Sequence, residues 1–253
     1  MPEEAFKGGI MARIPHDPKE IFQDIIDDYK GLYSDDLKSI ILYGSAAGRD
    51  YSPGRSDINF MIILSEEGIE NLDKAFKTIA RWKKRKVSTP LFLTRFYVNS
   101  STDVFPIEYL NFKQNHALVY GEDILNELSF DKEYVRLQCE REIKGKLLLL
   151  RETFLESEGK AHVLKAIIND SLQAFVSIFG ALLFIKDVKI PEDKLSIIKA
   201  VCETYGLNEN IFSKLMDIKN RKIKPDREDL KKTFKEYLSE IRTLSKIVDK
   251  LGG

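Results

Sequence analysis

The sequence predicts an α+β protein, in which residues 1–128 form a small sheet with flanking helices and residues 129–253 form an α-helical bundle. Two observations lead to this prediction. Short runs rich in β-branched and aromatic residues, Ser39–Tyr43 and Ile58–Leu64, are typical of buried strands. Beyond Phe130 such runs fade, and apolar residues recur at the spacing of three and four that marks one face of a helix.

The first predicted element is a helix over residues 18–33. Its apolar residues recur at helical spacing, Asp17 precedes it as an N-cap, and Pro18 occupies the favoured first position. After the strand that ends at Leu64, Ser65 can cap a second helix. One apolar stripe marks this helix: Ile69, Leu72, Phe76 and Ile79.

The second helix ends in a basic run, Arg81–Lys86, which has two interpretations. The cations can oppose the negative end of the helix dipole at a solvated surface. They can also form a cationic rim beside an anionic ligand. The next segment, Thr89–Val98, fits either a strand or a strand followed by a short helix.

Two further strands are predicted before the helical half. The run Asp103–Phe112 indicates a buried strand interrupted by one carboxylate, Glu108. A buried charge is costly unless it is paired or binds a cation, so Glu108 is either a salt-bridge partner or a functional group. Ala117–Tyr120 predicts a last short strand.

The second half of the chain predicts a bundle of about five helices. Asp131 can cap a helix that runs to about Glu156, and the helix that follows is apolar on nearly every side, as the central helix of a bundle is. The ranges of the four helices after the first are 160–186, 193–205, 211–220 and 226–250.

Composition argues against several functional classes. Forty basic residues balance forty acidic ones, so no net charge favours nucleic acid as a partner. No uncharged apolar run reaches the length of about 18 residues that a membrane-spanning helix needs, and the amino terminus lacks a secretory pattern, so we expect a cytoplasmic protein without a membrane partner. Cys139 and Cys202 are expected to be buried thiols, and the three histidines are expected to be surface or loop residues rather than metal ligands.

The stretch from Ser39 to Leu64 carries the chemistry. Gly44-Ser45 ends the first strand in a turn of small residues, which lets an anionic group approach backbone N–H donors. Asp57 and Asn59 project from one face at the start of the second strand, because side chains alternate along a strand. Together they form a pair of oxygen-bearing side chains.

Gly44-Ser45, an interval of eleven residues, and then Asp57-x-Asn59 before an apolar run resembles the signature of the DNA polymerase β-like nucleotidyltransferases. The resemblance departs at Asn59, where the family has a second carboxylate. It extends to the segments DVFPIEYLNFKQNHALVYGEDIL and REIKGKLLLLR, which look like small-molecule nucleotidyltransferases of the kanamycin type. The resemblance implies a small mixed sheet, the nucleotidyltransferase fold, followed by a helical carboxy-terminal domain.

The resemblance also implies the roles of five residues. Gly44 and Ser45 would bind the phosphates of a nucleoside triphosphate, Asp57 and Asn59 would hold Mg²⁺, and Glu108 would be a third metal ligand or a general base. Asp57 and Glu108 would be the catalytic residues. Because an amide oxygen carries no net charge, Asn59 is expected to weaken Mg²⁺ binding.

Several outcomes stay open from the sequence. The chain could transfer a nucleoside monophosphate from the triphosphate to a hydroxyl group of a small-molecule or protein acceptor. It could also bind nucleotide without turnover, or act as a protein-interaction or regulatory module on the same fold. The resemblance further implies a possible homodimer.

Overall fold

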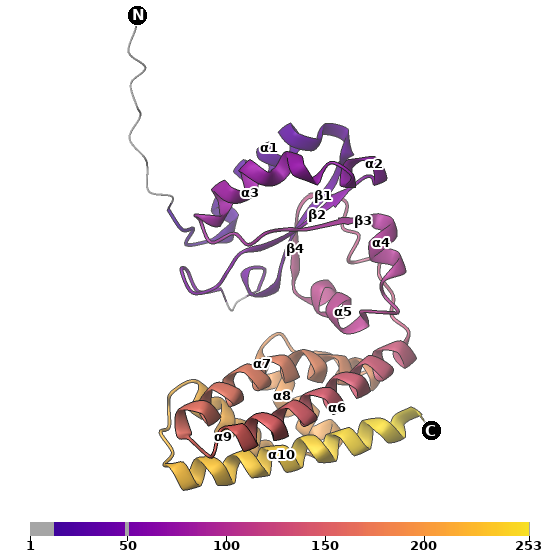
Figure 1. Ribbon diagram of the computed structural model, residues 1–253. Coiled ribbons are helices and arrows are strands. Elements are labelled where there is room, and N and C mark those ends of the chain that lie inside the picture. The colour runs from indigo at the N-terminus through magenta and orange to yellow at the C-terminus, as the bar shows by residue number, and fades with distance from the viewer. Residues whose placement is uncertain (1–12, 49–50, 253) are drawn as a thin grey trace, which may run out of the picture. The chain divides into compact units, whose positions relative to one another are not determined.

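The computed structural model describes residues 13–48 and 51–252, which divide into two compact units (Figure 1). The first unit comprises described residues up to Ser100 together with Phe112–Leu128. The second comprises Ser101–Asn111 and the residues from Ser129 onward. Residues 101–111 therefore group with the helical unit, whereas the sequence placed them in the first domain.

The first unit begins with the predicted capped helix. Asp17 accepts a hydrogen bond from the Lys19 N–H, and Pro18 opens a 3-10 turn, Pro18–Ile21, that leads into α1, Phe22–Tyr33. The residues that this helix buries recur at helical spacing: Ile21, Ile25, Tyr29 and Tyr33. The prediction of this helix is confirmed.

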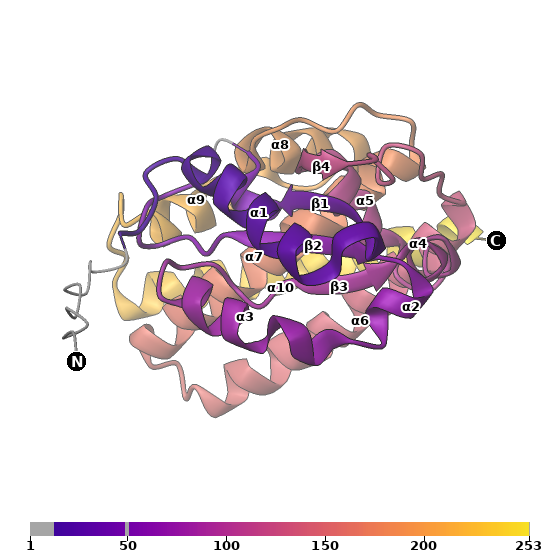
Figure 2. The same cartoon turned by 90° about the horizontal axis from the view of Figure 1, so that it is seen from above.

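The sheet of the first unit has four strands in the order β3-β2-β1-β4 (Figure 2). β1 pairs antiparallel with both β2 and β4, whereas β2 and β3 are parallel. The sheet is therefore mixed, and the predicted strands at 39–43, 58–64 and 117–120 are confirmed. The bounds of the strands are β1 Leu37–Tyr43, β2 Asn59–Leu64, β3 Leu91–Thr94 and β4 His116–Gly121.

One face of the sheet carries the core that includes α1. Ile40 and Leu42 of β1 and Phe60 of β2 belong to this core, together with Trp82 from the following helix. Because successive side chains point to opposite faces, Tyr43 and Asn59, which lie opposite each other at the ends of β1 and β2, point to the other face. Tyr43 and Asn59 therefore point to the face of the sheet opposite the one that α1 covers.

The connection from β2 to β3 is broken into three short pieces, not one helix. These are α2 Glu66–Ile69, a 3-10 turn Leu72–Ala75 and α3 Phe76–Lys83. Ser65 caps α2 as predicted, but Asn71 leaves the helical conformation. Phe76 is 68% exposed, so the single apolar stripe predicted from the sequence is wrong. After β3, α4 Arg95–Ser100 shows that Thr89–Val98 is a strand followed by a short helix.

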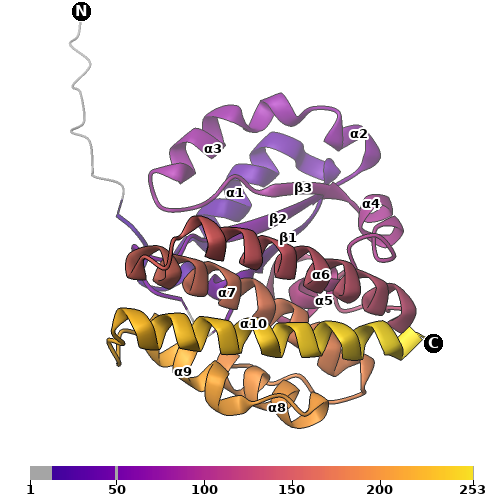
Figure 3. The same ribbon diagram turned by 60° about the horizontal axis from the view of Figure 1, so that its bottom comes forward.

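The second unit contains the predicted bundle, in which α6, α7 and α10 run alongside one another (Figure 3). α7 is central, and its buried face includes Phe175 and Phe179. These rings pack edge-on or tilted against one another and against Phe212 of α9 and Tyr237 of α10. The bounds are α6 Lys132–Glu156, α7 Ala161–Ile185, α8 Lys194–Tyr205, α9 Glu209–Lys219 and α10 Arg227–Asp249.

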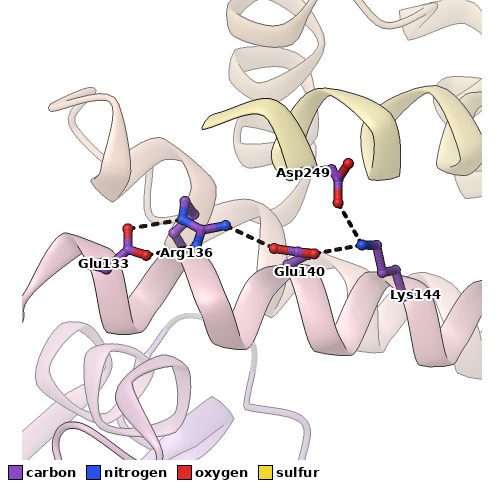
Figure 4. Close-up of polar contacts among 5 residues, drawn as sticks. All are labelled: Glu133, Arg136, Glu140, Lys144 and Asp249. Atoms are coloured by element: carbon purple, nitrogen blue, oxygen red, sulfur yellow. Dashed lines mark hydrogen bonds and ion pairs between the residues drawn. The ribbon is translucent and has the colours of Figure 1, made fainter. Parts of the chain in front are cut away.

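A chain of ion pairs on α6 reaches the end of α10 (Figure 4). The Arg136 guanidinium donates to the carboxylates of Glu133, at 2.7 Å, and Glu140, at 2.8 Å. Lys144 then donates to Glu140 and, across the helix pair, to Asp249 at 2.6 Å. The hydrogen bond from Arg136 lowers the pKa of Glu133, and the hydrogen bond from Lys144 lowers the pKa of Asp249. Both carboxylates are therefore held in their charged form.

The bundle bears on two predictions, one about the cysteines and one about membrane-spanning helices. Cys139 and Cys202 are both buried, and burial raises the pKa of each thiol, that of Cys202 to about 12. By length and composition, one helix among the described residues, α7, could cross a membrane. However, 56% of its apolar window is buried inside the protein, which is typical of the core helix of a bundle.

Candidate functional site

The turn after β1 is shaped by a glycine that a larger residue could not easily replace. Gly44 has φ +74°, in the left-handed region, and opens a 3-10 turn, Gly44–Ala46. Its N–H donates to the Asn115 carbonyl at 2.9 Å, and its carbonyl accepts from the Ala47 N–H at 3.0 Å. The start of β4 thus fixes the turn, and Ser45 follows at its first bend.

Asn59 lies directly beside this turn. It is opposite Tyr43, the residue before Gly44, in the antiparallel register of β1 and β2. A Cβ atom added to Gly44 would lie 3.7 Å from the Asn59 Nδ2 atom. The glycine turn and the Asn59 amide therefore line the same small region.

Asp57 lies two residues before Asn59, in the segment that leads into β2. Its side chain is 59% exposed, and its Oδ1 atom lies 3.9 Å from the Nζ atom of Lys86. The segments that carry Asp57 and Lys86 are paired. The Ile58 N–H donates to the Lys86 carbonyl at 2.8 Å, and the Ser88 N–H donates to the Ile58 carbonyl at 3.0 Å. The structure thus places a lysine beside the predicted carboxylate.

The two arginines of the basic run have a structural role. Arg81 pairs with Asp28 of α1, which also accepts from the Trp82 indole N–H at 2.7 Å. Arg85 lies over the Trp82 ring, 4.9 Å from its centroid, and 3.5 Å from a carboxylate oxygen on α1. These two arginines hold α3 to α1, whereas Lys86 is directed to Asp57.

Glu108 is not on a buried strand, so that prediction is wrong. Residues 106–114 form helix α5, Pro106–Gln114, and the Glu108 side chain is exposed. Its Oε2 atom accepts a hydrogen bond from the Gln138 Nε2 atom at 2.7 Å, while the Oε1 atom of Gln138 accepts from the Ile107 N–H. Two features favour the helix: Pro106 suits a first helical turn, and Ile107 and Leu110, three residues apart, are both buried in the bundle core.

Glu108 also belongs to the second unit, whereas Gly44, Ser45, Asp57 and Asn59 belong to the first. Its predicted role as third metal ligand or base therefore stays a prediction. Throughout residues 13–48 and 51–252, no three His, Cys, Asp or Glu side chains come together as a metal-binding group.

The chemistry of the donor set in the first unit does not fit a pair of Mg²⁺ ions. Two such ions require several carboxylate oxygens. Asp57 supplies one carboxylate, Asn59 a neutral amide, and Lys86 adds a cation beside the carboxylate. The local charge therefore disfavours the two-metal arrangement that the sequence resemblance implies.

His116 is a further residue at the strand ends that sequence reasoning missed. It lies opposite Tyr43 on the β4 side, so that Asn59, Tyr43 and His116 form one row across three strands. The imidazole is only 9% exposed; its Nε2 atom is 3.0 Å from an Asp123 carboxylate oxygen, and its Nδ1 atom faces two backbone carbonyls. The prediction of a surface or loop histidine is wrong here, because this ring is fixed within the sheet.

Comparison with known proteins gives similarity at the level of structure only. No protein-family model and no curated protein matches the chain. Among solved structures, the chain is similar to spectinomycin adenyltransferase AAD(9) from Enterococcus faecialis, determined with ATP and spectinomycin, at 12% sequence identity and a TM-score of 0.48. The similarity covers 87% of this chain and 99% of that one. A function for this chain therefore has to come from its own residues.

Proposed function

We propose that this protein binds a nucleoside triphosphate at the turn after β1 and transfers its nucleoside monophosphate to a hydroxyl group of a small-molecule or protein acceptor. The observation that supports the proposal most directly is the position of Gly44. This glycine, at φ +74°, opens a turn free of large side chains, directly beside Asn59 and close in sequence to Asp57. The spacing of these residues also matches the nucleotidyltransferase signature, except at position 59.

The turn offers the groups that phosphate binding needs. The first N–H groups of a helical turn have no acceptor within that turn, and we propose that the N–H groups of Ser45 and Ala46 donate to the phosphates. The Ser45 hydroxyl is half-buried and can add a further donor. The Gly44 N–H is held by Asn115 and serves to position the turn.

Asp57 and Asn59 are the residues we propose for the reacting end of the nucleotide. Asp57, in the segment that leads into β2, is the charged member of the pair, and Asn59, the first residue of β2, contributes a neutral oxygen in place of a second charge. Mg²⁺ is expected to bind weakly at this pair, because one carboxylate provides less negative charge than two. The role that the resemblance implies for Glu108, a further ligand or the base that accepts the proton of the acceptor hydroxyl, stays a prediction.

The test is calorimetric titration with ATP and with GTP, followed by measurement of pyrophosphate release. Wild type should bind one of these nucleotides, and Asp57→Asn should reduce pyrophosphate release with any acceptor that supports it. Far-ultraviolet circular dichroism would establish that both proteins are folded. The assignment is wrong if folded wild type binds neither nucleotide in any buffer.

Binding of nucleotide without turnover is the second candidate function, and Asn59 favours it. The variant Asn59→Asp restores the carboxylate of the signature at a position where the side chain is already half-buried at the end of β2. If wild type binds nucleotide but only Asn59→Asp releases pyrophosphate, the natural chain is a binder. If wild type itself releases pyrophosphate, the natural chain is an enzyme.

A further inference from the structure

Lys86 occupies a backbone position where glycine is usual. The Val87 N–H donates to the Trp82 carbonyl at 3.3 Å, and the Lys86 N–H donates to the Lys83 carbonyl at 3.2 Å, which closes the end of α3. The residue at the corner of such a helix end takes a left-handed conformation and is commonly glycine. Here it is a lysine with φ +65°.

A left-handed conformation is unfavourable for a residue that has a Cβ atom. Such backbone strain is found most often at functional sites, where the surrounding structure maintains it. At this corner the Ile58 N–H donates to the Lys86 carbonyl, which pairs the backbone of Lys86 with the segment that leads into β2. The Lys86 Nζ atom lies 3.9 Å from the Asp57 Oδ1 atom.

The charges around Asp57 differ from those of a two-carboxylate site. Asp57 contributes one negative charge, Asn59 none, and Lys86 one positive charge, so these three side chains sum to zero. A second carboxylate at position 59 without the lysine would give two negative charges. A site of zero net charge attracts divalent cations less strongly, and its ammonium group can bind a polyphosphate directly.

Both charged side chains are accessible to a ligand. The Lys86 side chain is 44% exposed and that of Asp57 is 59% exposed. At 3.9 Å their contact is longer than a hydrogen bond, so the ammonium group can donate to another acceptor without leaving a buried partner unpaired. The neighbouring arginines of the basic run, in contrast, are directed to α1.

We propose that Lys86 binds the triphosphate of the nucleotide directly and takes over the charge-neutralising role of a metal ion, so that nucleotide binding does not depend on Mg²⁺. This inference rests on the proposed function, because it assumes that a nucleoside triphosphate occupies the turn after β1. It gives a function to the lysine at this strained corner, beside the one carboxylate of the Asp57–Asn59 pair.

The experiment is isothermal titration of the full chain with ATP and with GTP, in buffer with EDTA and in buffer with Mg²⁺. Wild type is expected to bind with a Kd in EDTA within about threefold of that in Mg²⁺. Lys86→Gln keeps the length of the side chain and removes its charge, and should weaken binding in EDTA at least tenfold. Lys84→Gln, which removes an exposed charge from the same basic run, is the matched control and should leave both Kd values unchanged.

The outcomes separate this inference from the function on which it rests. Absence of binding of either nucleotide by folded wild type in both buffers overturns the proposed function. Binding that requires Mg²⁺, with no difference between Lys86→Gln and wild type, overturns the role of Lys86 and leaves the proposed function in place. An equal loss in Lys84→Gln and Lys86→Gln also overturns it, because the effect would then belong to the general charge of the run.

Discussion

Replacement of Gly44 by alanine tests the phosphate-binding turn most directly. At φ +74° an alanine carries strain of about 1 to 2 kcal/mol, offset in part by about 0.4 to 1 kcal/mol from the reduced freedom of the unfolded chain. The added methyl group meets the Asn59 Nδ2 atom at 3.7 Å, an ordinary contact. We therefore expect a loss of about 1 kcal/mol of folding stability, with the fold intact, but a methyl group where the phosphates approach.

Gly206→Ala is the matched control for this variant. Gly206 ends α8 with φ +67°, and a Cβ atom there would meet open space, so its backbone strain should be similar while the candidate site is untouched. Urea denaturation followed by circular dichroism would compare the two stabilities, and calorimetry would compare ATP binding. Gly44→Ala should weaken binding tenfold or more, and Gly206→Ala should not. Normal ATP binding by Gly44→Ala would refute the assignment of the turn.

Three further predictions concern the two units. Gly121→Ala should destabilise the first unit by about 3 kcal/mol or more, since its Cβ would lie 1.9 Å from the Lys38 carbonyl oxygen at φ +81°; fluorescence of the single tryptophan in urea would measure this. Phe212→Ala should cost the bundle about 3 to 5 kcal/mol, because the ring is fully buried, as a thermal melt would show. The bundle should also lose stability as the pH falls below about 4.3, since Glu133 and Asp249 have lowered pKa values when folded. The contribution of these two carboxylates to folding stability is fully present above their unfolded pKa values and is lost as the pH falls through their folded pKa values. The stability of the double variant Glu133→Gln, Asp249→Asn, measured by denaturation, should therefore depend less on pH in the acid range.

The elements that sequence reasoning predicted correctly have strong local signals. Four bundle helices, α6, α8, α9 and α10, begin with a capping side chain. Asp131, for example, accepts from the Glu133 N–H at 2.8 Å at the start of α6. The fifth, α7, has no such cap, and its signal is its long apolar sequence. The strands β1 and β2 are short apolar runs bounded by turn residues, and both are nearly free of exposed side chains. In these elements the local preference and the tertiary burial agree.

The failures occur where tertiary contacts decide between equal local alternatives. In α5, apolar residues lie on nearly all sides, so neither a period of two nor a helical period stands out. Tertiary contacts stabilise the helical conformation here. Ile107 and Leu110 pack in the bundle core, and Phe112 packs against Tyr43 of the sheet with ring centroids 4.8 Å apart. A helix that serves two units has no single apolar face for the sequence to show.

The position of Lys86 beside Asp57 could not be predicted from the sequence for a different reason. A lysine in a basic run carries no signal of a left-handed backbone, which is normally read from glycine or asparagine. The pairing of residue 58 with residues 86 and 88 brings this lysine to Asp57, while Arg81 and Arg85 pair with α1. The sequence therefore predicted the possibility of a cationic rim but not which cation would form it.

The effects of Asn59 and Lys86 on metal binding point in the same direction. An isolated Asn59 weakens a metal site, and an isolated lysine beside Asp57 repels a metal ion; a unit charge at about 4 Å is worth about 1 kcal/mol in water and about 4 kcal/mol at an effective dielectric constant of 20. If the site uses an ammonium group in place of a metal ion, both Asn59 and Lys86 favour binding of the nucleotide without Mg²⁺. Asn59→Asp and Lys86→Gln should then be coupled: each alone leaves a mismatched site, whereas the double variant should bind ATP with a strong dependence on Mg²⁺. Additive effects of the two substitutions would show that the residues act independently.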